Sequence, residues 1–307
     1  MRKTSLNCVH ELALKDSRVI FIGSDLGVGV LEKMKQEIPD RFIMEGVSEQ
    51  HIIGMAAGMA MDGFIPYVNT IATFLTRRCF EQNVIDLGLH NSNVRLIANG
   101  GGLVYAPLGP THLAIEDIAI MRTIPNMTIV VPADAEEMAR LMPKTLDYEG
   151  PIYIRLAKGY DPIVSDPELP FEIGKAIKYG NGNDVLLITT GITLGIAQKV
   201  SKKLKVNNID STILHVHTIK PFDKEKIIKV AEKIGVIVAI EEHTIIGGLG
   251  SACAEVILEA GFQTVKKFKR IGIQDNFPSG YGSQNSMMDR QNITSDNLIR
   301  VINSLID

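Results

Sequence analysis

The sequence has little of what several protein classes need. Its three cysteines, Cys8, Cys79 and Cys253, are odd in number and lack CxxC spacing, which argues against a disulfide framework and a zinc site. The longest apolar runs, 185–188 and 236–240, fall far short of the roughly 18 residues that span a bilayer. Basic residues are not in excess, because 32 Lys and Arg stand against 35 Asp and Glu. We therefore expect neither a membrane protein nor a nucleic-acid binder that works by neutralising phosphates.

Length and composition indicate the domain number. The 307 residues are about twice a common domain of roughly 150 residues, so two domains are expected. Hydrophobic residues make up 45% and charged residues 22%, which is typical of a globular protein and excludes a disordered chain. The first residues are basic, but the apolar stretch of a secretion signal does not follow them. We expect a cytoplasmic protein.

Short β-rich apolar segments alternate with longer segments of helical period, a pattern typical of α/β domains with parallel sheets. The first series predicts strands at 18–23, 42–46, 65–70, 94–99, 128–131 and 152–156, and helices at 28–37, 49–62, 72–91, 113–123 and 135–148. The second series predicts strands at 184–190, 210–215, 236–241 and 264–272, and helices at 194–205, 224–231, 249–259 and 297–305. A proline-containing segment without clear period separates them. We therefore expect two successive three-layer α/β domains, at 1–160 and 175–307, with a linker at 161–174.

Unusual residues follow several predicted strands, where open α/β sheets bind their ligands. Glu49 follows one strand and opens a helix, with Ser48 in the N-cap position. An acid at this place more often only complements the helix dipole. The helix behind it contains Gly54 and Gly58, and each glycine costs about 1 kcal/mol relative to alanine in a helix interior. The glycines therefore indicate a close backbone contact, either within the chain or at a subunit interface.

An ordered set of motifs resembles the transketolase family of thiamine diphosphate enzymes. Residues 42–51 (FIMEGVSEQH) and 54–58 (GMAAG) resemble the family's pyrimidine-binding domain, and their Glu-Gln-His is similar to 1-deoxyxylulose-5-phosphate synthase. Matching motifs lie in the family's order at 24–26 (SDL), 73–80 (TFLTRRCF), 109–112 (GPTH), 125–127 (PNM) and 150–155 (GPIYIR). Residues 241–251 (EEHTIIGGLGS) resemble the family's C-terminal domain. The resemblance covers essentially the whole chain and implies the family's pair of α/β domains.

The resemblance implies that Glu49 activates the cofactor. Its carboxyl would hydrogen-bond the pyrimidine ring nitrogen, and a protonated carboxyl there favours the imino tautomer that removes the thiazolium C2 proton. This task requires a buried Glu49 that can hold a proton. His112 would face the substrate's carbonyl or hydroxyl group. The resemblance also implies cofactor contacts by Asp25, Leu26, Phe74, Arg77 and Phe80.

Several of these roles have a simpler alternative. Phe80 fits the hydrophobic core as well as a cofactor contact, because aromatic side chains dominate protein cores. Arg77 either binds a substrate anion or lies on a solvated helix face. The resemblance further implies that Arg2 and Arg155 hold the phosphate of a sugar phosphate, a task for which the planar guanidinium is suited. Chain termini such as Arg2 are, however, often poorly ordered.

Two positions depart from the family's pattern. Leu108 stands where transketolases and deoxyxylulose phosphate synthases carry an Asp that contacts a substrate hydroxyl. Gly100 stands where transketolases carry a phosphate-contacting His. The usual ketose donor and a phosphorylated acceptor are therefore in doubt, and we expect a roomier or less polar substrate channel.

The family's full-length members carry an earlier domain that this sequence lacks. That domain binds the cofactor diphosphate and a divalent metal through a Gly-Asp-Gly…Asn motif, which does not occur here. We therefore expect this chain to hold the pyrimidine half of thiamine diphosphate, to ligate no metal itself, and to depend on an N-terminal transketolase subunit for Mg²⁺ and the diphosphate site, in an α2β2 assembly.

The function implied is transfer of a two-carbon ketol unit from a ketose to an aldehyde, with sugars or sugar phosphates as substrates. Two alternatives stay open: a subunit that condenses a 2-oxo acid with an aldehyde, as deoxyxylulose phosphate synthase does, and a non-catalytic partner subunit.

Overall fold

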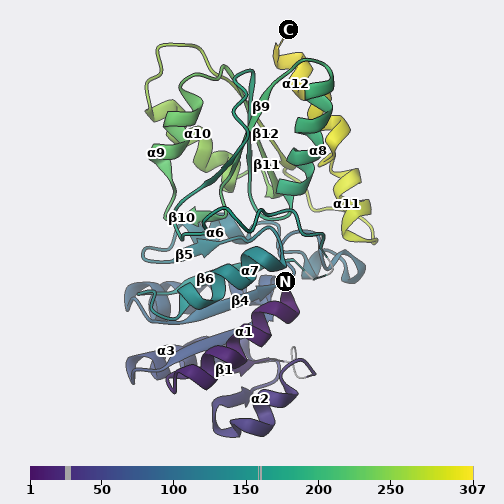
Figure 1. The fold of residues 1–307 in the computed structure, drawn as a ribbon. Helices are drawn as coiled ribbons and strands as arrows, with labels where there is room; N and C mark the ends of the chain where they lie inside the picture. Colours follow the sequence, from purple (N-terminus) through teal and green to yellow (C-terminus); the bar gives the residue numbers. More distant parts are fainter. Residues whose placement is uncertain (25–28, 158, 160, 307) are drawn as a thin grey trace.

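The computed structural model describes residues 1–24, 29–157, 159 and 161–306, and consists of two α/β domains that stand end to end (Figure 1). A seven-stranded sheet forms the first domain and a five-stranded sheet the second. Helices cover both faces of each sheet, so the predicted fold class is confirmed. Within these described residues, every helix is too short or too polar to cross a membrane.

The first sheet is almost entirely parallel. Its strands are β1 (Val19–Gly23), β2 (Phe42–Met44), β3 (Ile65–Ile71), β4 (Arg95–Asn99), β5 (Thr128–Val130), β6 (Ile152–Leu156) and β10 (Thr218–Lys220), in the order β10-β5-β6-β4-β3-β1-β2. Every residue of β1, β3, β4 and β6 is buried, as expected for a sheet with helices on both faces. The exception is β10, which comes from the second half of the chain and pairs antiparallel with β5.

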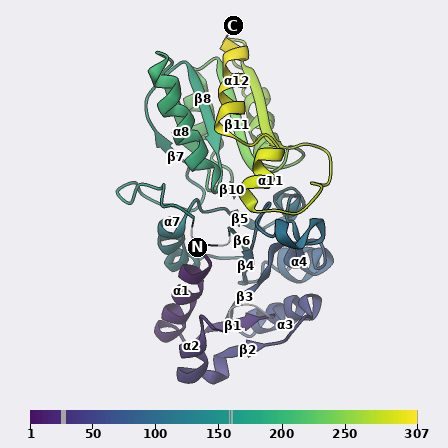
Figure 2. The ribbon, with the colours of Figure 1, turned by 90° about the vertical axis from the view of Figure 1, so that its right-hand side faces the viewer.

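Two groups of helices enclose this sheet. The helices are α1 (Arg2–Lys15), α2 (Glu32–Glu37), α3 (Glu49–Met61), α4 (Ala72–Thr76), α5 (Phe80–Gln82), α6 (Asp117–Arg122) and α7 (Ala135–Leu141). Figure 2 shows α1, α2 and α7 on one side of the strands and α3 and α4 on the other. The sequence analysis did not predict α1, although Leu6, Val9 and Ala13 recur at helical spacing and are buried.

The single helix expected at 72–91 is interrupted. It is divided into α4, α5 and the π-helix η2 (Asn83–Leu89). At the break the Asn83 side-chain amide donates to the Leu75 carbonyl at 2.7 Å, and the Cys79 thiol donates to the Phe74 carbonyl at 3.2 Å. These side-chain bonds satisfy carbonyls that a continuous helix would pair with backbone N–H groups. The break leaves Arg77 and Arg78 between α4 and α5.

The second sheet has the order β12-β11-β8-β9-β7. Its strands are β7 (Ile177–Tyr179), β8 (Val185–Thr189), β9 (Ser211–His215), β11 (Val236–Thr244) and β12 (Lys267–Ile273), and only β7 runs antiparallel to its neighbour. The helices are α8 (Thr193–Val206), α9 (Lys224–Ala231), α10 (Leu249–Glu259), α11 (Gln284–Arg290) and α12 (Ser295–Ile306). α8 packs against α12 on one face, and α9 packs against α10 on the other.

A buried polar cluster joins the domains. Asp117, at the start of α6, accepts hydrogen bonds from the Tyr153 hydroxyl and from Arg155 Nε, both at 2.7 Å. Arg155 Nη2 also donates to the backbone carbonyl of Glu242 in β11 at 2.9 Å. The Glu242 carboxylate in turn accepts from the Leu103 backbone N–H at 2.8 Å. Charged and polar groups of both domains are therefore hydrogen-bonded to one another in the interior of the joint.

Candidate active site

A cavity of about 510 Å³ lies where the break after α4 meets the 3-10 helix η4 (Pro110–His112). The residues that line it are Thr73, Phe74, Arg77, Arg78, Thr111 and His112. Three predicted site residues, Phe74, Arg77 and His112, are thus brought together, although His112 is far from the other two in the sequence.

The wall of the cavity pairs an aromatic ring with an imidazole. The rings of Phe74 and His112 meet edge to face, with centroids 5.2 Å apart. Thr111 Oγ1 lies 2.9 Å from His112 Nδ1 and so fixes the orientation of the imidazole. A flat apolar surface therefore stands beside an imidazole whose ring nitrogens can donate or accept hydrogen bonds.

Glu49 reaches this cavity through Arg78. As the first residue of α3, Glu49 has only 2% of its surface exposed. Its Oε2 lies 2.6 Å from Arg78 Nη1, and the Arg78 guanidinium carbon lies 4.2 Å from the centre of the Phe74 ring. Ser48 holds the N-cap position, but its hydroxyl donates to the Glu45 carbonyl and makes no capping bond. A buried carboxylate, a guanidinium and an aromatic face are therefore in continuous contact.

Arg78 was missed by the sequence analysis. Its signal was present, because it directly follows Arg77 in the motif that contains Phe74. Adjacent residues on a helix lie on different faces, so a continuous helix would not bring both arginines to one site. Because the helix is interrupted after α4, Arg77 and Arg78 both line the cavity.

Arg77 connects α4 to the loop that carries His112. Its Nε lies 3.0 Å from Glu116 Oε1, and its Nη2 donates to the Thr111 carbonyl at 3.0 Å. Burial raises the pKa of Glu116, and the Arg77 charge opposes that shift. Arg77 is therefore held by two partners at the cavity and does not lie on a free helix face.

Comparison with known proteins identifies the family. Residues 1–160 match the model of the transketolase pyrimidine-binding domain, and residues 174–297 match the model of the transketolase C-terminal domain. The chain belongs to the transketolase family. Members of this family depend on thiamine diphosphate, and the chain is a transketolase-type transferase subunit.

The relatives include subunits of split transketolases. The chain is 32% identical to the 6-deoxy-6-sulfo-D-fructose transketolase subunit SqwH of Clostridium sp. (strain MSTE9), over 100% of this chain and 94% of the relative. It is 34% identical to an apulose-4-phosphate transketolase subunit of Phocaeicola vulgatus, over 84% of this chain and 83% of the relative.

A longer relative and a solved structure complete the comparison. The chain is 35% identical to the 1-deoxy-D-xylulose-5-phosphate synthase of Trichormus variabilis, but it spans only 42% of that enzyme. A solved split-gene transketolase, described as an inactive β4 tetramer, superposes with a TM-score of 0.90 at 31% identity, over 99% of this chain and 97% of that chain.

Arg155 lies buried at the joint between the two domains. Only 5% of its surface is exposed, and its guanidinium pairs with Asp117 and two backbone carbonyls at the domain joint. This placement supports a structural role, because a partnered, buried charge is costly to release. The phosphate contact of Arg155 stays a prediction. Arg2 is the first residue of α1 and is ordered by that helix, rather than lying in a loose terminus.

The predicted cofactor contacts not yet described are Phe80, Asp25 and Leu26. Phe80, at the start of α5, is half-buried and packs against the core that also contains Leu75 and Cys79, which favours the core interpretation. Asp25 and Leu26 lie outside the described residues.

The two departures from the transketolase pattern have distinct surroundings. Leu108 ends the 3-10 helix η3 (Ala106–Leu108), just before η4, and 51% of its surface is exposed. Gly100 has a φ of +76°, and a Cβ built on it would overlap the Tyr105 ring. Glycine adopts that backbone more easily than any other residue. A histidine at position 100 would in addition require the Tyr105 ring to move, because its Cβ would overlap that ring.

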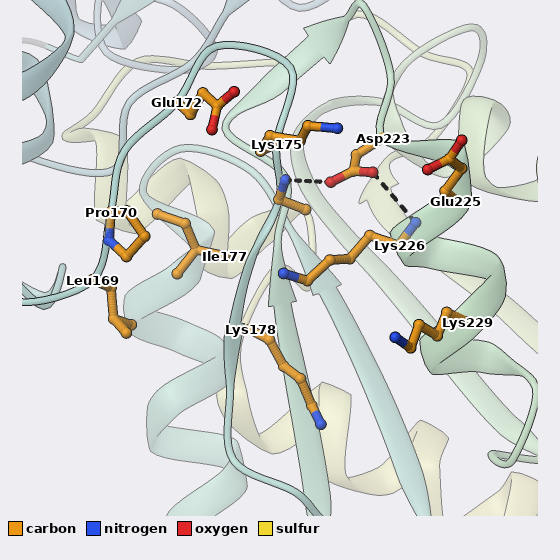
Figure 3. A pocket seen from close by; sticks show the side chains of 11 residues that line it. Leu169, Pro170, Glu172, Lys175, Ile177, Lys178, Asp223, Glu225, Lys226 and Lys229 are labelled. Atoms are coloured by element: carbon orange, nitrogen blue, oxygen red, sulfur yellow. Dashed lines mark hydrogen bonds between the residues drawn. The ribbon is translucent and has the colours of Figure 1, made fainter.

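A second cavity, of about 490 Å³, lies in the other domain, between β7 and the start of α9 (Figure 3). Its lining includes Lys175, Lys178, Lys226 and Lys229, while the Asp223 carboxylate accepts from the backbone N–H groups of Ala176 and Lys226. None of the predicted site residues that the structure describes lines it. We therefore place the candidate active site at the cavity that contains Phe74 and His112.

Proposed function

We propose that this chain is the C-terminal subunit of a heteromeric transketolase, which moves a two-carbon ketol unit from a ketose to an aldehyde. The observation that carries the proposal is the meeting of the Phe74 ring and His112 at one cavity, to which buried Glu49 is joined through Arg78. This set fits an aminopyrimidine, because a flat ring needs an apolar face to stack on and a carboxyl at its ring nitrogen.

In this proposal each side chain has a defined task. Phe74 stacks on the pyrimidine ring, and Glu49 holds a proton on its carboxyl against the ring nitrogen. His112 donates to or accepts from a substrate oxygen, since the Thr111 hydroxyl fixes its ring. Thiamine diphosphate, when bound, supplies the carbon nucleophile for the transfer. The edge-to-face contact of Phe74 and His112 keeps the stacking surface next to the group that acts on the substrate.

The diphosphate and its Mg²⁺ belong to the N-terminal partner in this proposal. Within the described part of the chain, no group of three His, Cys, Asp or Glu side chains is close enough to hold a metal ion. The Gly-Asp-Gly…Asn motif is also missing from the sequence. Mg²⁺ requires several oxygen ligands, so the partner subunit would provide them.

An α2β2 assembly is supported by the exposed side of α3. A Cβ at Gly58 would meet nothing within 4 Å, so packing among the described residues of this chain does not explain that glycine. Large apolar side chains are exposed on the same helix and on its neighbour η2: Met61 is 61% and Leu89 69% exposed. Sedimentation of a Gly58→Arg variant should show a smaller assembly than the wild-type chain. An unchanged assembly would place the interface elsewhere.

We also propose the domain limits 1–160 and 175–307, with 161–174 as the connection. The segment between β6 and β7 contains no helix or strand among its described residues, which supports this division.

The proposal is tested with the chain alone and with an N-terminal transketolase subunit. We expect ketol transfer only in the mixture, and only with thiamine diphosphate and Mg²⁺. Glu49→Gln should lower turnover by at least about 100-fold, the usual range for a proton-transferring group, without changing assembly. Glu259→Gln, an exposed change at the end of α10, is the matched control and should keep full activity. Turnover by the isolated chain, or full activity of Glu49→Gln, would refute the proposal.

A second candidate is condensation of a 2-oxo acid with an aldehyde. The identity of 35% to a deoxyxylulose phosphate synthase supports it. Release of CO₂ from pyruvate by the reconstituted pair would favour this reaction over ketol transfer, and its absence would exclude it.

A further inference from the structure

We propose that the Arg78 guanidinium occupies the place of the cofactor's pyrimidine ring in the free chain, so that the cofactor must displace it to bind. This inference rests on the proposed function, because it concerns the same cavity. Arg78 is then a positioning residue: the Glu49 carboxyl and the Phe74 ring can contact the cofactor only after the Arg78 guanidinium has moved away.

Two contacts define the position of the guanidinium. Arg78 Nη1 lies 2.6 Å from Glu49 Oε2, and the guanidinium carbon lies 4.2 Å from the centre of the Phe74 ring. A guanidinium is flat, delocalised and rich in N–H donors, so it stacks on aromatic faces and bonds carboxylates at the same time. A pyrimidine ring stacked on Phe74 and bonded to Glu49 would use the same face and the same oxygen. The two planar groups cannot be present together.

Burial explains why the free chain needs such a group. Glu49 has 2% of its side chain exposed, and Arg78 Nη1 is the cation on its carboxylate. A buried carboxylate that loses its cation must take up a proton or attract another cation. Arg78 therefore occupies the carboxylate that the proposed function assigns to the ring nitrogen of the cofactor, and departure of Arg78 would free that carboxylate.

Arg78 has a route out of the cavity. Its side chain is 41% exposed, against 2% for Glu49, so the guanidinium can swing into water while the carboxyl stays buried. Arg77 cannot substitute for it, because its guanidinium is held by Glu116 and by the Thr111 carbonyl. Of the two adjacent arginines, Arg78 is therefore the one placed to compete with a ligand.

Thiamine binding to the isolated chain tests this inference, because thiamine contains the pyrimidine ring without the diphosphate that the partner would hold. If Arg78 fills the site for about nine tenths of the time, its removal should tighten thiamine binding about tenfold. In calorimetry, Arg78→Ala should therefore bind thiamine about tenfold more tightly than the wild-type chain. The thiamine affinity of Arg78→Lys should lie between those of the wild-type chain and Arg78→Ala. Ethylguanidinium should compete with thiamine in Arg78→Ala. Arg18→Ala, which removes an exposed arginine paired with Asp16, is the matched control and should bind like the wild-type chain.

A second measurement separates competition from a general loosening of the fold. The gain in thiamine binding should disappear in the double variant Arg78→Ala, Glu49→Ala, because the gain requires the carboxylate that Arg78 releases, whereas a general loosening of the fold would not depend on Glu49. Unchanged or weaker thiamine binding by Arg78→Ala would overturn the inference and make Arg78 part of the ligand's own binding surface. If the wild-type chain with its partner bound no thiamine diphosphate, the proposed function itself would fail, which is a different result.

Discussion

The polar cluster at the domain joint gives the sharpest stability prediction. Asp117→Ala removes the carboxylate bonded to Arg155, whose guanidinium then stays buried without that counter-ion. An exposed ion pair contributes about 0–1 kcal/mol, but breaking a buried pair from one side costs about 3–5 kcal/mol. Asp117 is fully buried and Arg155 is 5% exposed, so the larger figure applies. The midpoint of thermal unfolding should fall by about 6–10 °C.

Chemical and thermal denaturation of matched variants measure this effect. Asp117→Asn keeps the shape and one hydrogen bond but not the charge, so it should lose less than Asp117→Ala. Arg155→Met alone leaves Asp117 unpaired and should also destabilise the chain. In the double variant Asp117→Asn, Arg155→Met the buried charges are both gone, so stability should recover by several kcal/mol relative to the sum of the single losses. Additive losses, or a loss below about 1 kcal/mol for Asp117→Ala, would refute the reasoning.

Three further predictions follow from single side chains. Burial raises the pKa of the Cys79 thiol to about 12, so thiol reagents at pH 8 should modify it only after unfolding; rapid labelling of the native chain would contradict this. Burial raises the pKa of Glu242 from 4.5 to about 7, so between these pH values the folded state binds a proton that the unfolded state does not, and the free energy of unfolding should fall as the pH rises. Glu242→Gln should make this fall smaller in denaturation curves at pH 5 and 7, and an unaltered pH dependence would contradict the prediction. Leu108→Asp lies on an exposed position and should change stability by less than about 0.5 kcal/mol while altering the choice of sugar substrate, which kcat/KM for a panel of ketoses would show.

The strands of both domains could be predicted because their signals are local. Inner strands such as β1 and β8 consist almost entirely of consecutive apolar residues, and the structure buries them completely. The short strands β7 and β10 were missed, since each has three residues and one of them is a lysine, Lys178 or Lys220, which leaves no apolar run. The break after α4 was also missed. It depends on the hydrogen bond from the Asn83 amide to the Leu75 carbonyl. Such a side-chain bond does not change the spacing of apolar residues, from which helices are predicted.

For the site, the motifs indicated residues of α4 and η4 that the structure brings together, but they did not indicate the pairing of charges. Phe74 and His112 meet at one cavity although the chain separates them. The burial and pairing of Arg155 could not be predicted, because its partner Asp117 lies 38 residues earlier and no local pattern reveals an ion pair at that distance. Arg78 was overlooked for the same reason: its significance comes from Glu49, which belongs to another helix.

Strand β10 has a consequence for how the two halves can be separated. It belongs to the second half of the sequence but completes the first sheet at β5. Lys220, at its end, also donates to the carbonyls of Arg122 and Ile124 in the first half. A protease that cuts the segment between β6 and β7 would therefore leave a nicked protein whose fragments stay together. Expressed alone, the first fragment would lack strand β10 of its own sheet and the second would carry β10 without its partner β5, so only the two together would restore the fold.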